Sequence, residues 1–164
     1  MLKPRSLAAA LAGAVPDLAT DPDRFQCYVE RGRLVARATP GLGFEYHYQL
    51  AIFVLDYAGE PDAILFPLLQ WLRVNQPEQL LNPELRDDAL RFEVDLLDQH
   101  HCNISIEIQL TETVTAAARD DGGYDLTHGD EPGPVDGEAY AILKELGLLQ
   151  PGEQPAALWP PAAD

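Results

Sequence analysis

Positive charge is scarce in this sequence. Of its 164 residues, 11 are lysine or arginine and 27 are aspartate or glutamate, so the formal net charge is −16 at pH 7. A protein that binds nucleic acid by neutralising phosphates, or that lies on an anionic membrane surface, needs the opposite balance. No apolar run approaches the roughly 18 residues of a membrane span either. The composition argues against sequence-specific nucleic-acid binding and against a membrane partner.

Cysteine is scarce as well. Cys27 and Cys102 lie far apart in the sequence and have no metal-like spacing. In a reducing compartment, isolated cysteines of this kind usually serve as small buried hydrophobic residues. The sequence therefore predicts no metal and no other cofactor.

A convincing active-site motif is missing. His100, His101 and Cys102 fall in a short link between strand-like segments, where successive side chains point in different directions. Glu45 and His47 share one face of a predicted strand, with Asp56 near in sequence, but no nucleophile accompanies this acid–base pair. We expect structural roles for these residues and no enzymatic activity.

Two further groups are too sparse for the sites that they suggest. Asp120, Asp121 and Asp125 lack the number and the spacing of the ligands in a calcium loop. The glycines of Gly41–Gly43 precede a strand rather than a helix, and their motif is too short to bind a phosphate.

The stretch Phe44–Asn75 organises the predicted fold. Its first part alternates polar and apolar residues and becomes apolar at every position from Ala51 to Leu55, which predicts a central strand covered on both faces. A helix is expected to begin near Asp62, with Pro67 close to its first turn, where few hydrogen bonds are lost. Its buried stripe is predicted to contain Ile64, Leu65, Leu68, Leu69 and Leu72, widened by Trp71.

Two hairpins are predicted on either side of this stretch. Phe25–Ala38 reads as two short strands joined by Arg31 and Gly32, because glycine at the second position suits a tight two-residue turn. The segments Leu90–Leu96 and Cys102–Leu110 alternate regularly and are joined by a short link. They predict an antiparallel hairpin with one apolar and one polar face.

The first 15 residues admit two interpretations. Lys3 and Arg5 precede an alanine-rich run in which Ala12–Ala14 imitates the cleavage site of a signal peptide. Alanine makes a poor signal-peptide core and a good helix, and Pro4 suits a helix start, so we favour an amphipathic helix. Its apolar positions are Leu7, Leu11, Ala14 and Leu18.

The predicted fold class is α+β. One domain over residues 1–115 has a small mixed or antiparallel sheet with two main helices packed on it. An acidic arm rich in proline and glycine follows over 116–164, with one short helix candidate at Asp136–Leu149.

Charge is unevenly distributed along the chain. Basic residues outnumber acidic ones over residues 1–37, and acidic residues dominate afterwards. In a self-associating protein, the positive part of one subunit can then meet the negative part of the next. A solvated acidic surface without such a role explains the pattern equally well. The residues that we expect at such a contact are Arg31, Arg33, Arg37, Glu60, Asp62, Asp87 and Asp88.

Three stretches carry a resemblance to a known family. They are Leu2–Leu7 with its alanine-rich helix, Phe44–Pro77 ending in PLLQWLRVNQP, and Phe92–Asp95 followed by Ser105–Ile108 and Leu110–Glu112. In this order they resemble the tail completion protein R family of temperate, contractile-tailed phages. The resemblance covers roughly residues 1–113, and its most specific block, Pro67–Pro77, is a packing motif.

The resemblance implies a structural protein of the virion tail, made in the host cytoplasm, that finishes the tail and makes it competent to join the head. By analogy with tail-terminator proteins, it implies a six-fold ring of small α/β subunits on the last tube ring. Expected partners are other copies of the chain, the tail tube and sheath proteins, and head–tail connector proteins. DNA would at most pass through the lumen, where a negative wall prevents adhesion.

Two other classes of function stay open. One is an acidic inhibitor that mimics DNA, which requires a continuous acidic stripe on a monomer. The other is a small hydrolase that uses His47 or His100, which requires a concave pocket around either histidine.

Overall fold

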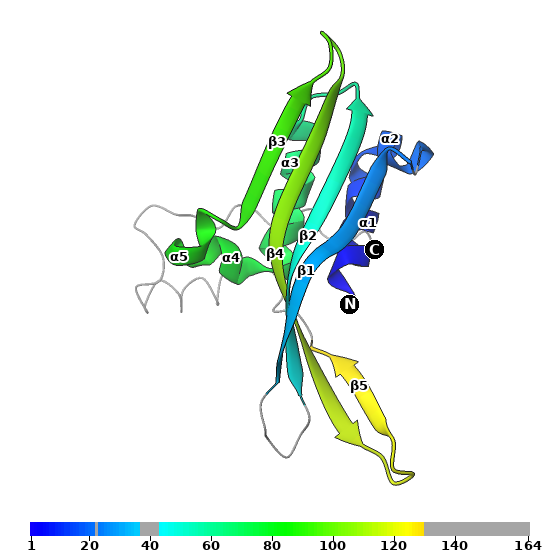
Figure 1. The fold of residues 1–164 in the computed structure, drawn as a ribbon, viewed down its shortest axis with the longest axis vertical. Helices are drawn as coiled ribbons and strands as arrows, with labels where there is room; N and C mark the ends of the chain where they lie inside the picture. Colours follow the sequence, from blue (N-terminus) through cyan, green and yellow to red (C-terminus); the bar gives the residue numbers. More distant parts are fainter. Residues whose placement is uncertain (22, 37–42, 130–164) are drawn as a thin grey trace, which may run out of the picture.

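Four antiparallel strands in the order β1-β2-β4-β3 form the sheet on which the fold is built (Figure 1). The computed structural model describes residues 1–21, 23–36 and 43–129, so Arg37 and the helix candidate at 136–149 lie outside the described residues. A fifth strand pairs with the far end of β4. The strands are β1 (Phe25–Ala36), β2 (Phe44–Tyr57), β3 (Leu90–Leu96), β4 (Cys102–Ala118) and β5 (Tyr124–His128).

The two main helices, α1 and α3, pack against each other on one face of this sheet (Figure 1). Trp71 of α3 donates a hydrogen bond from Nε1 to Oγ of Ser6 in α1, at 3.1 Å. The predicted α+β class is therefore confirmed. The helices are α1 (Lys3–Ala14), α2 (Pro16–Thr20), α3 (Asp62–Asn75), α4 (Pro77–Leu81) and α5 (Pro83–Arg86).

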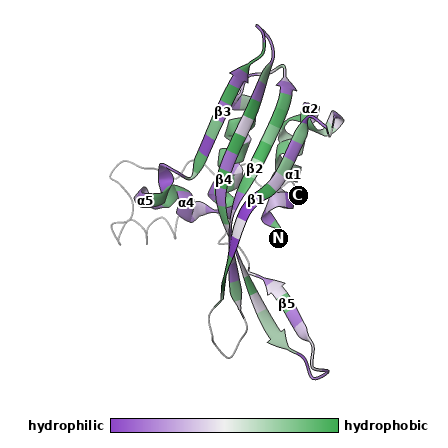
Figure 2. Cartoon of the chain, in the orientation of Figure 1, coloured by the Kyte–Doolittle hydropathy of each residue, from purple (hydrophilic) through white to green (hydrophobic). Residues whose placement is uncertain are grey.

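The core lies between the central strands and the two main helices. Apolar and polar residues alternate along the strands (Figure 2), and β2 pairs with β4 so that Ile52 lies opposite Ile106. Every second side chain of both strands therefore faces the helices. The fully buried side chains include Leu7 and Leu11 of α1, Leu50 and Ile52 of β2, Ile64, Leu68 and Leu72 of α3, and Ile104, Ile106, Ile108 and Leu110 of β4.

Helices cover only one face of β2, so the prediction of a strand covered on both faces is wrong for the described residues. On the other face, which we call the open face, Phe53 stacks on Tyr28 of β1 with ring centroids 5.9 Å apart. Leu55 is exposed. Cross-strand ring stacking accommodates apolar residues on an uncovered sheet face, because each ring shields the other from water.

The first predicted hairpin is wrong, because β1 is one continuous strand through Arg31 and Gly32. The register with β2 shifts between Val29 and Arg31, which makes Glu30 the extra residue of a bulge. A Cβ atom at Gly32 would lie 3.4 Å from the Cβ atom of Tyr48. An added Cβ atom would thus make an ordinary van der Waals contact, and Gly32 is part of the continuous strand instead of a turn.

The predicted boundary at residue 115 falls inside β4, which continues to Ala118 and pairs with β5. Within the proline- and glycine-rich sequence that suggested an arm, residues 120–123 form a tight turn, in which Gly122 has a φ of 82°. Arg119 lies 2.8 Å from Asp121 and 3.4 Å from Asp125, so ion pairs occupy part of the acidic trio. The ordered hairpin thus reaches beyond the predicted domain.

Helix α3 confirms most of its predicted stripe, with two corrections. Leu69 is 43% exposed and does not belong to the core. Pro67 lies past the first turn of a helix that begins at Asp62. Since proline has no N–H, the carbonyl of Ala63 loses its helical partner. The buried residues of the stripe are Ile64, Leu68, Trp71 and Leu72.

Replacing Leu68 with alanine should lower the free energy of unfolding by about 2–5 kcal/mol, because the change removes buried apolar surface and leaves a cavity. The adjacent Leu69→Ala variant is the matched control and should cost about 0.5 kcal/mol, as an exposed site does. Urea denaturation measures both. Equal losses in the two variants would contradict the assignment of this helix face to the core.

Candidate functional site

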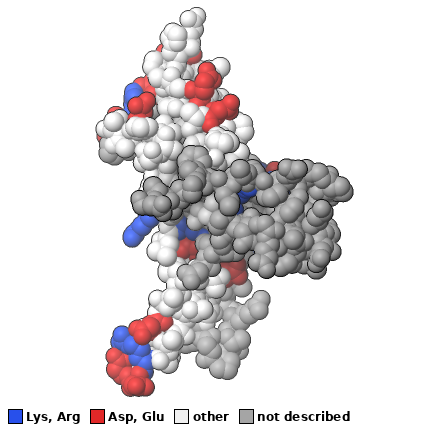
Figure 3. Space-filling model, turned by 180° about the vertical axis from the view of Figure 1, so that it is seen from behind, with Lys and Arg blue, Asp and Glu red and all other residues white. Residues whose placement is uncertain are grey.

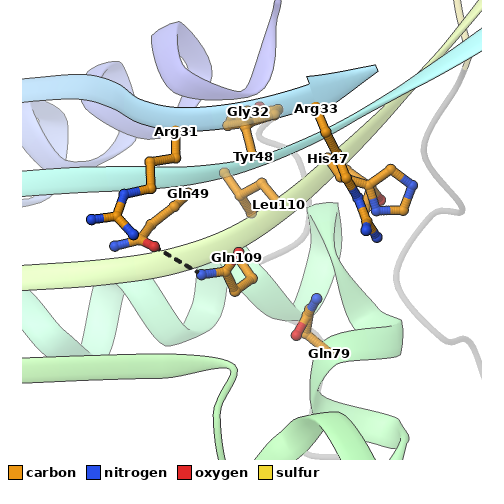
Figure 4. A pocket seen from close by; sticks show the side chains of 10 residues that line it. Arg31, Gly32, Arg33, His47, Tyr48, Gln49, Gln79, Gln109 and Leu110 are labelled. Atoms are coloured by element: carbon orange, nitrogen blue, oxygen red, sulfur yellow. Dashed lines mark hydrogen bonds between the residues drawn. The ribbon is translucent and has the colours of Figure 1, made fainter. Parts of the chain in front are cut away.

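A polar cavity of about 360 Å³ lies on the open face of the sheet (Figure 4). Its floor is closed by a 3.3 Å hydrogen bond from Nε2 of Gln109 to Oε1 of Gln49. The cavity is basic on its β1 side, where neither Arg31 nor Arg33 has an ion-pair partner among the described residues. The lining comprises Arg31, Gly32 and Arg33 of β1, His47, Tyr48 and Gln49 of β2, Gln79 of α4, and Gln109, Leu110 and Thr111 of β4.

His47, the basic half of the predicted acid–base pair, lines the cavity, whereas Glu45 does not. His47 lies with Nε2 3.3 Å from Oε1 of Glu45, which confirms that the two residues share one strand face. Thr111 also lines the cavity, but its hydroxyl accepts a 2.9 Å hydrogen bond from Nε2 of Gln76. No hydrogen bond among the described residues joins this hydroxyl to His47. A concave pocket thus surrounds His47 without a nucleophile activated by it.

The histidines of the β3–β4 link belong to a turn, as predicted. The Asp98 carboxylate accepts hydrogen bonds from the backbone N–H groups of His100 at 2.7 Å and His101 at 2.8 Å. These bonds and the His101 side chain hold the pKa of Asp98 below its usual value. Cys102 is buried next to the turn. Asp56, which the sequence placed near Glu45 and His47, instead forms an ion pair with Arg24.

The remaining candidate residues contribute no metal site. No group of three or more His, Cys, Asp or Glu residues in the described part of the chain is placed to hold a metal ion. Both cysteines are free, and burial raises the pKa of the Cys27 thiol to about 11. None of the described helices is both long and apolar enough to cross a membrane.

The predicted contact residues lie in three separate places. Arg31 and Arg33 are on the exposed edge strand β1, which runs without interruption through the position of the predicted turn. Glu60 and Asp62 are exposed at the start of α3, and Asp87 is exposed after α5. Asp88, next to it, is engaged within its own chain, at 2.5 Å from Arg91.

A buried carboxylate on β4 is a feature that our sequence reasoning missed. Glu112 is 4% exposed and accepts hydrogen bonds from the backbone N–H groups of Leu2 at 2.7 Å and Lys3 at 3.2 Å, and from the Tyr48 hydroxyl at 2.5 Å. Nδ1 of His128 in β5 lies 3.2 Å from Oε2, the oxygen that also accepts from Leu2. The signal was present, since Glu112 occupies an inward position of an alternating strand where a charged residue requires partners.

Gln76, at the end of α3, completes this cluster. It is fully buried, and its Oε1 accepts hydrogen bonds from Nζ of Lys3 at 2.5 Å and from the backbone N–H of Thr111 at 3.2 Å. On this side of β4, the β3 ladder ends opposite Ile108 and the β5 ladder begins opposite Val114. Gln76 thus supplies a hydrogen-bond partner where β4 has no neighbouring strand.

The cluster, which we call the Glu112 cluster, joins the chain's N-terminal segment, the end of α3 and both strands of the β4–β5 hairpin. It is built from Leu2, Lys3, Tyr48, Gln76, Thr111, Glu112 and His128. Members come from each of the three stretches on which the family resemblance rests. Burial acts to raise the pKa of Glu112, but the hydrogen bonds from Tyr48, Leu2 and Lys3 outweigh it and the pKa lies below its usual value.

Replacing Glu112 with glutamine should lower the free energy of unfolding at pH 7 by about 1–3 kcal/mol, because buried donors lose a charged acceptor. A lowered pKa in the folded state gives stability that is present above the unfolded pKa of about 4.3 and is lost as pH falls through the folded value. The variant should lack this part of the acid dependence. Denaturation at pH 7 and between pH 5 and 3 measures the free energy of unfolding and its dependence on pH.

The control is Glu107→Gln, which changes an exposed carboxylate of the same strand. Equal losses of stability in the two variants would contradict the role of the cluster.

Two comparisons with known proteins identify the family of this chain. A family model described as P2 phage tail completion protein R (GpR) matches residues 1–132. Tail completion protein R of Escherichia phage P2 is 36% identical over 134 residues, which cover 82% of this chain and 86% of that protein. No solved structure matches the chain. The family model and the phage P2 protein each match most of this chain, so the chain belongs to the P2 phage tail completion protein R family.

Proposed function

We propose that this chain is a structural component of a phage tail, that it forms a ring at the head-proximal end of the tail, and that this ring allows the head to join. Family membership supports the role in tail completion. The partners that follow are other copies of the chain, the last ring of the tail tube, the sheath and the head–tail connector. Assembly would take place in the host cytoplasm and the product would remain in the virion tail.

The observation that carries the ring is the pair of free sheet edges. Strands β1 and β3 lie at opposite edges, and each pairs with a single described strand. Both edges expose apolar side chains, such as Leu34 on β1 and Leu96 on β3. Long open edges of this kind favour pairing with another chain. Because the two edges differ, contact between them is head-to-tail, and such contacts form a ring when the rotation between neighbouring subunits closes.

The lower part of the molecule supports a second contact along the tail axis. The ends of β1 and β2 and the hairpin of β4 and β5 extend away from the helix-covered body (Figure 1). Tyr124 and Leu126 of β5 are exposed there. We propose that this hairpin, together with residues 130–164, is the arm that reaches a tube or connector protein.

The charge distribution favours this reading over a DNA mimic. On the helix side, acidic side chains form separate groups, and those at the lower hairpin are mixed with basic ones (Figure 3). The mixture at the hairpin comes from Arg119 with Asp121 and Asp125. Among the described residues that are visible on that face, the acidic side chains do not form the continuous stripe that a mimic of DNA needs.

Phage lysates made without this protein should contain tails that do not join heads, and adding the full-length protein should restore infectious particles. A chain truncated after Gly129 keeps every described strand and should fold but complete tails poorly, because the arm is shortened. Electron microscopy of tails and light scattering of the purified protein measure both. Normal head-bearing tails in the complete absence of the protein would contradict the proposed function.

A further inference from the structure

The geometry points to the way in which neighbouring subunits join: β3 of one subunit pairs antiparallel with β1 of the next, so that one sheet continues around the ring. This inference rests on the proposed function, because it takes the partner at each edge to be a second copy of the chain. Strand directions, apolar side chains and charges support it separately.

Strand directions allow the pairing without turning any subunit over. Each adjacent pair in the order β1-β2-β4-β3 is antiparallel, so β1 and β3 of one subunit run in opposite directions. When a second subunit is placed beside the first in the same orientation, its β1 strand lies antiparallel to the first subunit's β3 strand. The helices of all subunits then stay on the same side of the continued sheet.

Apolar side chains on the helix side of both edges are incompletely covered within one subunit. On β3, Phe92 is 52% exposed and Leu96 is 80% exposed, although both lie on the face that carries the core. On β1, Leu34 is 54% exposed on the same face, where it pairs with Tyr46. Edge-to-edge pairing would bring these side chains onto one face and continue the core into the next subunit.

Exposed charges on the open face are mainly basic at the β1 edge, where Glu30 is the acidic exception, and mainly acidic at the β3 edge. Arg31 and Arg33 lie on β1 opposite Gln49 and His47, and no ion pair occupies them among the described residues. Glu93 and Asp95 lie on the same face of β3, opposite Ser105 and Asn103, and both are exposed. Arg91, the basic residue of that strand, is already paired with Asp88. A β1 edge therefore meets a β3 edge with complementary charge.

Ring closure also sets the level at which the strands meet. Four strands spaced about 4.8 Å apart, tilted by about 35–45° to the ring axis as in closed barrels, give a stagger of roughly 13–19 Å, or four to six residues, from one subunit to the next. We place the helices on the outer surface of the ring. The right-handed coil of twisted strands then shifts the neighbour's β1 along β3, toward Glu93 and Asp95. Arg31 and Arg33 then come level with Glu93 and Asp95.

Charge reversal tests this pairing. The Arg31→Glu/Arg33→Glu variant and the Glu93→Arg/Asp95→Arg variant should each associate about tenfold or more weakly than the unmodified chain at low salt, because attractive cross-strand pairs become repulsive. A chain that carries all four changes restores complementary edges and should associate about as well as the unmodified chain. An equimolar mixture of the two double variants should also recover association, with the two chains alternating.

Light scattering at several ionic strengths measures association, and urea denaturation confirms that each variant is folded. Glu107→Arg, on the same face but on an interior strand, is the control and should associate normally. A folded four-fold variant that stays as weak as the double variants would overturn the inference, and so would double variants that associate normally. In either case a wild-type ring that completes tails leaves the proposed function standing, whereas a wild-type chain that neither associates nor completes tails removes that function itself.

Discussion

The pairing of β2 with β4 is the constraint on which the rest of the structure depends. The two strands pair from Phe44 opposite Val114 to Tyr57 opposite Cys102, and they carry much of the fully buried apolar surface. Helix α3 continues from the end of β2 and folds back onto this pair, where α1 packs beside it. The ladder ends at Val114, and β4 continues beyond it to pair with β5 in a hairpin that extends away from the helix-covered body (Figure 1). The covered body and the protruding hairpin are therefore both built on β4.

The Glu112 cluster provides hydrogen-bond partners at the junction between the covered body and the hairpin. Where β3 has ended and β5 has not begun, the edge of β4 that faces away from β2 has no described strand beside it, and Gln76 supplies an acceptor there. Glu112 next to it holds the backbone at Leu2 and Lys3, so that α1 is fixed at the point where the covered body passes into the hairpin. Removal of a partner from such a network is costly because the remaining polar groups stay buried. The cluster thus connects the β4–β5 hairpin, through Glu112 and His128, with the N-terminal end of α1.

Much of the fold follows from periodicity, and the failures have identifiable causes. Alternation predicted β2, β3 and β4, and helical spacing predicted α1 and α3, because a buried stripe leaves a direct pattern. The Arg31–Gly32 pair misled, since a glycine within a continuous strand looks the same in sequence as a glycine in a turn. Leu69 misled because apolar residues at the margin of a helix stripe can remain exposed. The Glu112 cluster joins positions 110 residues apart, and only the charged residue at an inward position of β4 hinted at it.

Hydrogen exchange of the backbone amides in the edge strands tests most directly whether one sheet continues between subunits. In the assembled protein, amides of β1 and β3 should exchange about as slowly as those of β2 and β4, because hydrogen bonds between subunits protect them. In the dissociated Arg31→Glu/Arg33→Glu variant, the same edge amides should exchange fast while β2 and β4 stay protected. Edge amides that exchange equally fast in the assembled and the dissociated protein would contradict a sheet shared between neighbouring subunits.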